Sequence, residues 1–300
     1  MDVYLVDGTY ELFRHFYAVP SHVNSVGEEV GAVVGVLDSV ASMLENSVTH
    51  VGVATDHVIR SFRNDLWPGY KTEEGVPPQL LAQFPLLEEA LTAMGVVVWP
   101  MVELEADDAL AGAAASLGRF SEVHHVLICT PDKDLAQCVV SDRVLQLDRR
   151  AQRYRDEIGV IEKYGVAPSS IPDYLALVGD TSDGYPGLEG WGEKSTSAVL
   201  SSYTHLEAIP ADGTEWKIKP RRYDALAKTL RENMKLALLF RDLATLRKDE
   251  PRIKSPDELS WKGPDESFST MCKRLDAPGL EAKVAGLRSK SIVGQVAPVT

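Results

Sequence analysis

Acidic residues in this chain recur just past the ends of short apolar runs. Asp7, Asp56 and Asp132 each stand in such a position. The runs alternate with segments whose apolar residues recur at helical spacing, and this alternation predicts an α/β fold with a largely parallel sheet. Ligands of open α/β sheets bind beyond the carboxyl ends of the strands, so we expect these three acids to meet at one edge of the sheet.

The pattern also predicts how the chain is organised. We expect strands over 3–6, 50–55, 96–99, 123–129 and 143–147, and helices over 31–44, 77–94 and 105–117. Strand signals fade after about residue 154, and further helices are expected over 171–178, 193–203 and 221–246. Short helices and a loose tail after Ser289 should follow. The expected units are an α/β domain over 1–165, a helical region over 166–255 and a C-terminal helical segment with a tail over 256–300.

Composition bounds the class of protein. With 300 residues and 44% apolar content, the chain can bury a sizeable core. It contains no run near the roughly 20 apolar residues that a membrane span needs, and its first residues lack the basic leader and long apolar segment of a signal peptide. The odd number of cysteines, without C-x-x-C pairing, favours reduced core thiols. We therefore expect a cytoplasmic protein.

Nine acidic residues are candidate metal ligands: Asp7, Asp56, Glu105, Asp107, Asp108, Asp132, Asp134, Asp180 and Asp183. Carboxylates packed together repel and raise each other's pKa unless a cation neutralises them. Hard divalent ions such as Mg²⁺ prefer oxygen ligands, and two such ions suit hydrolysis of phosphate esters. If the acids converge, they predict a nuclease. For 105–108 alone the alternative is a helix N-terminus, which favours acids through its dipole.

Net charge gives a conflicting signal about nucleic acid. The net charge of −13 argues against a phosphate-rich partner, but setting the nine candidate ligands aside leaves only −4. Local basic groups matter more, and the chain has two: Arg60 with Arg63 and Lys71, and Lys217, Lys219, Arg221 and Arg222. Each group taken alone is also typical of an ordinary solvated surface.

Two further motifs have a functional and a structural interpretation. Three glycines in 187–192 stand directly before a predicted helix, followed by Lys194. Such a turn exposes backbone N–H groups at a positive helix end and suits a nucleic-acid backbone, although it also suits a simple connection between packed helices. Tyr70 and Lys71 offer a ring for base stacking and a cation for a phosphate, but also fit a polar loop.

Taken in order, these motifs resemble a known family. They are Leu5–Gly8, Thr55–Asp56, Ser61–Arg63, Tyr70–Lys71, Glu105–Asp108, Asp132–Asp134, Gly179–Asp183 and Gly192–Lys194. Over about residues 1–250 the chain strongly resembles the bacterial 5′→3′ exonuclease and flap endonuclease family, which includes the N-terminal 5′-nuclease domain of DNA polymerase I. The resemblance implies a PIN-like 5′-nuclease domain with a mostly parallel central sheet flanked by helices. A C-terminal helical region with a helix-hairpin-helix (H3TH) motif should follow.

The resemblance implies a function as well as a fold. Family members are structure-specific nucleases that hydrolyse DNA phosphodiesters at 5′ ends or 5′ flaps with two Mg²⁺ or Mn²⁺ ions, in replication or repair. By similarity the nine acids hold the ions, with Asp180 and Asp183 completing the second site or binding through water. Lys71, helped by Arg63, would stabilise the transition state, and Tyr70 would stack on an unpaired base.

The resemblance also implies how DNA is held. We expect the protein to act as a monomer and to have no membrane partner. DNA-binding positions would be Arg14, Gly187, Gly190, Trp191, Gly192, Glu193, Lys194 and Ser195. In relatives the hairpin holds K⁺ through main-chain oxygens, which here would be those of Leu177, Val178, Pro186, Leu188 and Trp191.

Three positions depart from the family pattern. Pro131 stands where Gly is usual, Gly184 where Asn is usual, and Glu74 where an Arg usually clamps phosphate. Glu74 predicts weaker capture of the 5′ end, and it favours an alternative in which the chain is a catalytically weak DNA-binding module that retains the nuclease fold. A second alternative is an RNA-cleaving domain of the PIN type, but such domains are generally shorter and lack the hairpin.

Overall fold

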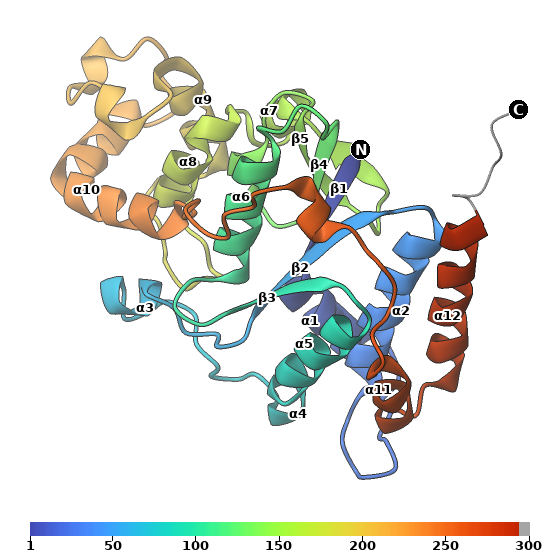
Figure 1. The fold of residues 1–300 in the computed structure, drawn as a ribbon. Coiled ribbons are helices and arrows are strands. Elements are labelled where there is room, and N and C mark those ends of the chain that lie inside the picture. The colour runs from blue at the N-terminus through green and yellow to red at the C-terminus, as the bar shows by residue number, and fades with distance from the viewer. Residues whose placement is uncertain (294–300) are drawn as a thin grey trace, which may run out of the picture.

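A six-stranded sheet lies at the centre of the computed structural model, which describes the backbone of residues 1–293 and the side chains of residues 1–287 (Figure 1). The strand order is β3-β2-β1-β4-β5-β6, and every pairing is parallel except β5 with β6. The strands are β1 (Asp2–Asp7), β2 (His50–Asp56), β3 (Val97–Met101), β4 (His125–Cys129), β5 (Val144–Asp148) and β6 (Arg153–Arg155). The predicted mostly parallel sheet is confirmed.

Helices cover both faces of the sheet. Along β1 the side chains alternate, so that Val3 and Leu5 pack with helix α6 (Ala106–Leu117), whereas Val6 packs with the helices of the opposite face. These are α2 (Gly31–Glu45) and α5 (Gln83–Ala93). Burial on both faces explains why β2 is buried at every residue rather than alternating with polar positions.

Some elements differ from the sequence-based expectation. Helix α1 (Gly8–Ala18) was not predicted, and it starts directly at the end of β1 because Asp7 caps it. Gly8 permits this close approach, since a Cβ there would lie 2.7 Å from the carbonyl oxygen of Ala54. The predicted helix 77–94 is divided at Ala82 into α4 (Pro78–Leu81) and α5. Other elements that were not predicted are α3 (Arg63–Leu66), α7 (Glu157–Tyr164) and β6.

A second group of helices packs around its own core, to one side of the sheet (Figure 1). It comprises α8 (Ile171–Val178), α9 (Glu193–Tyr203) and α10 (Tyr223–Ala244), with α10 interrupted by non-helical backbone at Asn233. Short 3₁₀ helices complete the connections: η1 (Asp134–Cys138), η2 (Pro168–Ser170), η3 (Leu206–Ala208), η4 (Gly213–Glu215) and η5 (Pro256–Leu259). The predicted helical region is therefore present.

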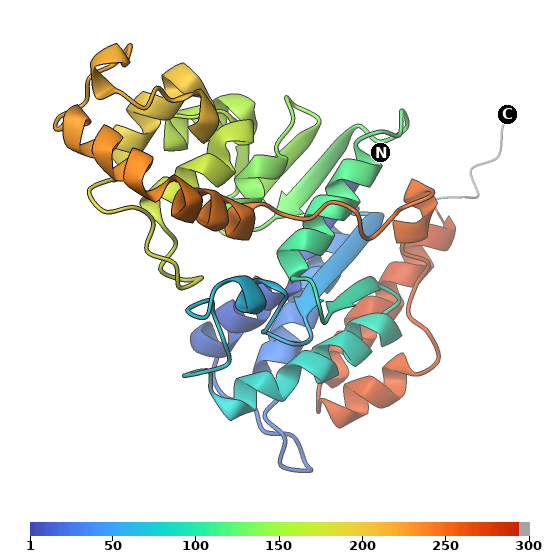
Figure 2. The same cartoon turned by 90° about the vertical axis from the view of Figure 1, so that its left-hand side faces the viewer.

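The chain then returns to the sheet (Figure 2). Leu246, Ile253 and Leu259 join the apolar cluster under α6. Helices α11 (Phe268–Arg274) and α12 (Pro278–Val293) pack on α5 and α2. The C-terminal segment is thus an added layer on the α/β part.

Three further sequence-based expectations concern the C-terminal tail, the cysteines and membrane-spanning helices. The tail was expected to begin after Ser289, whereas α12 continues to Val293, and 294–300 lie outside the described residues. The cysteines, Cys129, Cys138 and Cys272, are all free and buried. Among the helices that the structure describes, none is long and apolar enough to cross a membrane.

Candidate metal centre and DNA interface

One pocket at the carboxyl edge of the sheet gathers five of the nine predicted acids. Its lining includes Asp7, Asp56, Asp107, Asp132 and Asp183. These residues come from the ends of β1 and β2, the first turn of α6, the segment after β4 and the connection between α8 and α9. Such convergence is beyond what helix capping explains, because only Asp7, which caps α1, and Asp107, in the first turn of α6, lie at the start of an α-helix.

Backbone and hydroxyl donors hold the first two of these acids in place. The carboxylate of Asp7 accepts hydrogen bonds from the Tyr10 amide at 2.8 Å and from the Thr130 hydroxyl at 2.9 Å. The Asp56 carboxylate accepts one from the Ala106 amide at 2.7 Å and so links β2 to the start of α6. Each of these carboxylates therefore has a fixed orientation.

A second group of acids lies around the connection between α8 and α9. Asp134, Asp180 and Asp183 each offer one carboxylate oxygen, and these three oxygens all lie within 4.8 Å of one another. Oδ1 of Asp134 is buried and has no hydrogen-bond partner among the described residues. A buried, unpartnered carboxylate oxygen beside two other carboxylates fits a hard divalent cation, whose ligands are oxygens.

Crowding and burial disturb the acidity of these carboxyls. Burial, aided by the charges of Asp132 and Asp56, raises the pKa of Asp7 to about 7. Burial and the neighbouring acids likewise raise the pKa of Asp183 to about 6, and those of Asp107 and Asp134 well above the ordinary value. Carboxyls that resist ionisation in this way are typical of a cation site, because a bound cation favours their ionised form.

Lys71 supplies positive charge beside the pocket. It lies on the segment that joins α3 to α4 (residues 67–77, here called the strap), with its ammonium 2.8 Å from Glu105 and 3.4 Å from Asp183. Burial opposes the charged form, but the two carboxylates outweigh it and raise the pKa of Lys71. Burial would raise the pKa of Glu105, yet Lys71 and Arg63 lower it to about 2.

Arg63 and Asp108 are buried against each other, away from the acidic pocket. Arg63 is only 1% exposed, and its guanidinium donates two hydrogen bonds to the Asp108 carboxylate, at 2.7 and 2.8 Å. Asp108 is fully buried and also accepts from the amides of Glu105 and Arg247. Neither side chain lines the acidic pocket. In this conformation the Asp108 carboxylate is occupied by Arg63 and two amides, so the two residues support the structure around the pocket. The metal-binding role of Asp108 and the transition-state role of Arg63 stay predictions.

Tyr70 is buried in this conformation, and its base-stacking role stays a prediction. Its side chain is 3% exposed and belongs to the core of the helical part. The hydroxyl donates to Glu105 at 3.3 Å. Tyr70 therefore anchors the strap to the helical part and so helps to fix the position of its neighbour Lys71.

Two of the three family departures have a visible structural setting. Gly184 has a φ of +80°, and a Cβ there would lie 2.0 Å from the carbonyl oxygen of Gly69 on the strap. Glycine is therefore required for this close contact between the strap and the α8–α9 connection. Glu74 is exposed on the strap. Nothing in the structure explains Pro131.

The glycine turn forms a tight hairpin between α8 and α9. Gly179 packs directly on the backbone at Pro186, and Gly190 has a φ of +82°. Lys194 and Glu193 are exposed at the start of α9, whereas Trp191 is buried. The DNA-binding roles of this turn stay predictions.

The remaining predicted site residues are the K⁺ ligands, which lie in and before the hairpin, and Arg14, which lies on α1. Of the expected K⁺ ligands, the carbonyl oxygen of Leu177 accepts from the Leu188 amide at 2.9 Å, and that of Leu188 accepts from the Trp191 amide at 3.1 Å. The K⁺ site stays a prediction. Arg14 lies far from the hairpin in the chain, on α1, where it pairs with Glu11 and lines a separate pocket.

Several residues that support the site were missed by sequence reasoning. Thr130 holds Asp7, and the Thr9 hydroxyl accepts from the Asp56 amide at 2.8 Å. Glu88 on α5 accepts from the Thr55 hydroxyl at 2.7 Å and lies 2.7 Å from the His57 ring, so it anchors both neighbours of Asp56. The threonines lie within two residues of predicted acids, which is a usable signal, but nothing local marks Glu88.

The raised pKa values predict a pH dependence for the protein kept free of metal. Between about pH 4 and pH 7 the folded state keeps the Asp7 proton that the unfolded state has released, and Asp183 behaves in the same way up to about pH 6. The folded state binds more protons, so stability should fall as pH rises through this window. His50, whose pKa burial lowers, opposes this effect, and acids with a lowered pKa such as Glu105 oppose it near pH 4 to 5.

Thermal unfolding in EDTA at about pH 5 and about pH 8 measures this effect. We expect the melting temperature to be lower at the higher pH, and Mg²⁺ to remove most of the difference. The Asp7→Asn variant should show a smaller pH effect in EDTA. Equal pH effects in EDTA and Mg²⁺ would show that the carboxyls do not titrate as a metal site.

Comparison with known proteins assigns the chain to a family. Residues 2–165 match the family model "5′-3′ exonuclease, N-terminal resolvase-like domain", and residues 166–267 match "5′-3′ exonuclease, C-terminal SAM fold". The chain is 32% identical to the 5′-3′ exonuclease of Aquifex aeolicus, over 91% of this chain and 95% of that protein. It is 31% identical to DNA polymerase I of Bacillus caldotenax, over 92% of this chain but only 32% of the polymerase.

Solved structures show the same fold. The bacteriophage T5 D15 flap endonuclease in a complex with DNA and metal ions superposes with a TM-score of 0.62 at 18% identity, covering 98% of this chain and 100% of that chain. The catalytic core of Rad2 in complex with a DNA substrate gives a TM-score of 0.64 at 15% identity, over 95% of this chain and 91% of that chain. The expected PIN-like architecture is thereby confirmed. On the two family models and the identity to full-length relatives, the chain belongs to the 5′-3′ exonuclease family.

Proposed function

We propose that this chain is a structure-specific 5′ nuclease that hydrolyses DNA phosphodiesters at 5′ ends or 5′ flaps with two divalent metal ions, Mg²⁺ or Mn²⁺. One observation carries the proposal: carboxylates from five separate segments converge in one pocket beside Lys71. Family membership supports the reaction class, and the intact acids argue against a binding module without turnover.

The donor set suggests how the ions would be divided. Asp7, Asp107 and Asp132 would hold one ion, and Asp134, Asp180 and Asp183 the other. When bound, two divalent ions stabilise the charge that develops on the attacking and leaving oxygens of a phosphodiester.

The protein's own groups complete the chemistry. The Lys71 ammonium, now shared between Glu105 and Asp183, lies at the edge of the pocket and would offset charge on the scissile phosphate. Glu105 and Tyr70 hold it there. The hairpin before α9 would grip the backbone of the duplex without reading its sequence, and K⁺ would bind to its main-chain oxygens. We further propose that the protein acts as a monomer in the cytoplasm, in DNA replication or repair.

Cleavage of a 5′-labelled flap duplex tests this function. We expect cutting near the junction in Mg²⁺ or Mn²⁺ and none in EDTA. A matched substrate with an RNA flap tests the alternative of an RNA-cleaving enzyme, because preferential cutting of RNA would favour that class. Binding of the DNA flap without cutting in either metal would favour the inactive DNA-binding module.

Glu74 is the residue that favours weak activity, because its exposed carboxylate lies on the strap, three residues from Lys71. Reversing this charge with Glu74→Arg should tighten binding of the flap substrate about three- to tenfold, as expected for an exposed charge near phosphate. The gain should shrink at high salt. The measurement is KM for flap cleavage at two salt concentrations.

Glu45→Arg is the matched control for this variant. It makes the same charge change at an exposed position at the end of α2, away from the strap. Equal effects of the two variants would mean that Glu74 acts only through net charge.

A further inference from the structure

A short basic segment lies beside the hairpin and has no role in the account so far. Residues 216–222, here called the basic loop, carry Lys217, Lys219, Arg221 and Arg222 and no acid. All four side chains are exposed, and none forms a salt bridge with any of the residues that the structure describes. Four unpaired cations in seven residues are notable in a chain whose net charge is −13.

The basic loop is held in a defined position by the hairpin itself. Trp216 is 3% exposed, and its ring centroid lies 6.0 Å from that of Trp191 in the hairpin. The Trp216 indole donates to the carbonyl oxygen of Pro210 at 2.8 Å, and the Lys217 amide donates to the Tyr203 hydroxyl at 2.8 Å. The loop therefore presents its cations from a fixed backbone.

The two segments share one surface. A pocket between them is lined by Gly190, Gly192 and Lys194 of the hairpin and by Pro220 and Arg221 of the basic loop. The hairpin segment 187–195 is itself slightly acidic, because Glu189 and Glu193 outnumber Lys194. Its backbone amides would need positive charge from elsewhere to attract phosphate, and the basic loop is where that charge is found.

The aromatic residues nearby indicate which form of nucleic acid fits. Proteins that bind single strands stack bases on exposed rings. Here Trp191 and Trp216 are buried, while the ammonium groups of Lys217 and Lys219 lie 5.6 and 5.3 Å from the ring centroids of Tyr203 and Tyr223. Cations over half-buried rings suit a phosphate backbone better than unpaired bases.

We propose that the basic loop and the hairpin form one surface for the backbone of double-stranded DNA, in which the loop supplies most of the electrostatic attraction. This rests on the proposed function and deepens it, because it assigns the cations that hold the duplex while the acidic pocket acts on the 5′ end.

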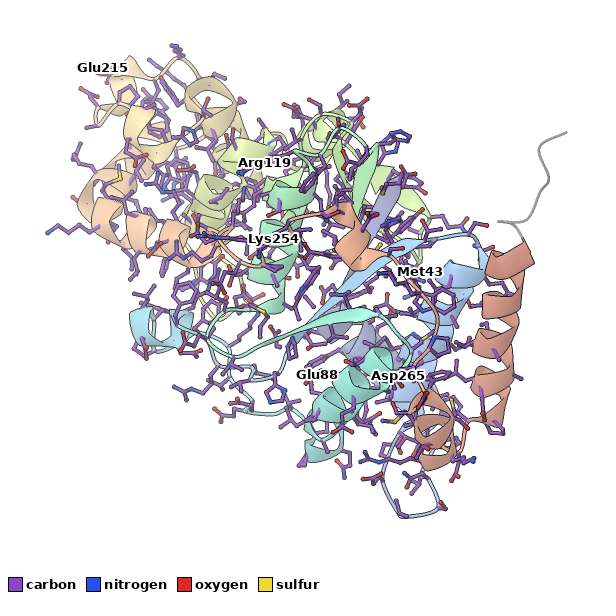
Figure 3. All side chains as sticks on the ribbon, viewed as in Figure 1. Met43, Glu88, Arg119, Glu215, Lys254 and Asp265 are labelled. Carbon is purple, nitrogen blue, oxygen red and sulfur yellow. The ribbon has the colours of Figure 1, made fainter. Side chains whose placement is uncertain are left out.

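Salt-dependent binding of a short blunt DNA duplex in EDTA tests the proposal by fluorescence anisotropy. The loop variant is Lys217→Gln, Lys219→Gln, Arg221→Gln. The control variant is Arg119→Gln, Lys254→Gln, Lys262→Gln, which makes the same charge change at exposed positions. Figure 3 shows Glu215, next to the basic loop, at the far end of the helical part, whereas Arg119 and Lys254 lie closer to the sheet.

Each phosphate contact contributes about 0.9 to the slope of log affinity against log salt. We expect the slope of the loop variant to fall by about 2.7 and its affinity at low salt to drop at least about tenfold, with the control variant close to wild type. The single variant Arg221→Gln, with an expected loss of about 0.9 in slope, serves if the triple variant melts at a lower temperature than wild type.

The outcomes separate this proposal from the function on which it rests. Duplex binding by wild type with equal slopes for the loop and control variants would overturn the role of the basic loop alone. A larger loss for a single-stranded oligonucleotide than for the duplex would also overturn it. Failure of the wild-type protein to bind or cut any DNA would instead overturn the proposed function.

Discussion

Replacing Asp107 by Asn should lower the rate of Mg²⁺-dependent flap cleavage about a thousandfold or more and, at the same time, stabilise the metal-free protein. Asp107 lines the acidic pocket from the first turn of α6. Burial and the charges of Asp132 and Asp7 raise its pKa well above the ordinary value, so its ionised form opposes folding when no cation is bound. Asn keeps the shape and removes the repulsion.

Single-turnover cleavage and thermal unfolding, each in Mg²⁺ and in EDTA, measure the two effects. We expect a higher melting temperature than wild type in EDTA and a smaller increase on adding Mg²⁺. Asp142→Asn changes an exposed acid after η1 and should alter neither property. A variant that cuts DNA normally would remove Asp107 from the metal site, and a lower melting temperature in EDTA would give it a structural role instead.

Replacing Arg63 by Ala should lower the free energy of unfolding by about 3–5 kcal/mol, because it leaves the buried Asp108 carboxylate without its partner. The guanidinium also donates to the carbonyl oxygens of Leu243 at 2.7 Å and Thr245 at 3.3 Å, at the end of α10. Arg63 thus connects α3, α6 and the helical part. Its loss should weaken the contact between the two cores as well as the local ion pair.

Urea unfolding of the variant measures this loss. Arg60→Ala removes an exposed arginine three residues earlier and should change stability by less than about 0.5 kcal/mol. Adding Asp108→Asn to Arg63→Ala should recover part of the loss, because the uncompensated charge is then gone. If the double variant is no more stable than Arg63→Ala, the cost lies in the contacts to α10 rather than in the ion pair.

Asp107 and Asp108 show that acids with similar sequence signals can lie in different surroundings. Asp107 and Asp108 are neighbours in the same helical turn, yet one lines the pocket and the other is fully buried against Arg63. A helix turns by about 100° per residue, so adjacent side chains point in different directions. The direction in which each points is set by what packs against the helix, which the acidic motif does not record.

Local pattern was sufficient for the elements with strong periodicity. The five predicted strands are present, and they pair in parallel. They could be recognised in the sequence because the strands of a parallel sheet are short apolar runs. Helix α1 was missed because Thr9, Tyr10 and Phe13 have only moderate helix propensity, and its formation depends on the cap that Asp7 provides. The break at Ala82 between α4 and α5 also depends on packing.

The sequence by itself determined the parallel sheet, the convergence of Asp7, Asp56 and Asp132 at its carboxyl edge, and the family, since strand ends and ordered motifs are local properties of the chain. Tertiary structure alone decided that the side chains of Arg63 and Tyr70 are buried beside the pocket. It also placed the basic loop beside the hairpin through the contact of Trp216 with Trp191. The physical reason is that burial and long-range pairing depend on which surfaces meet, and residues far apart in the chain settle that only when both cores have formed.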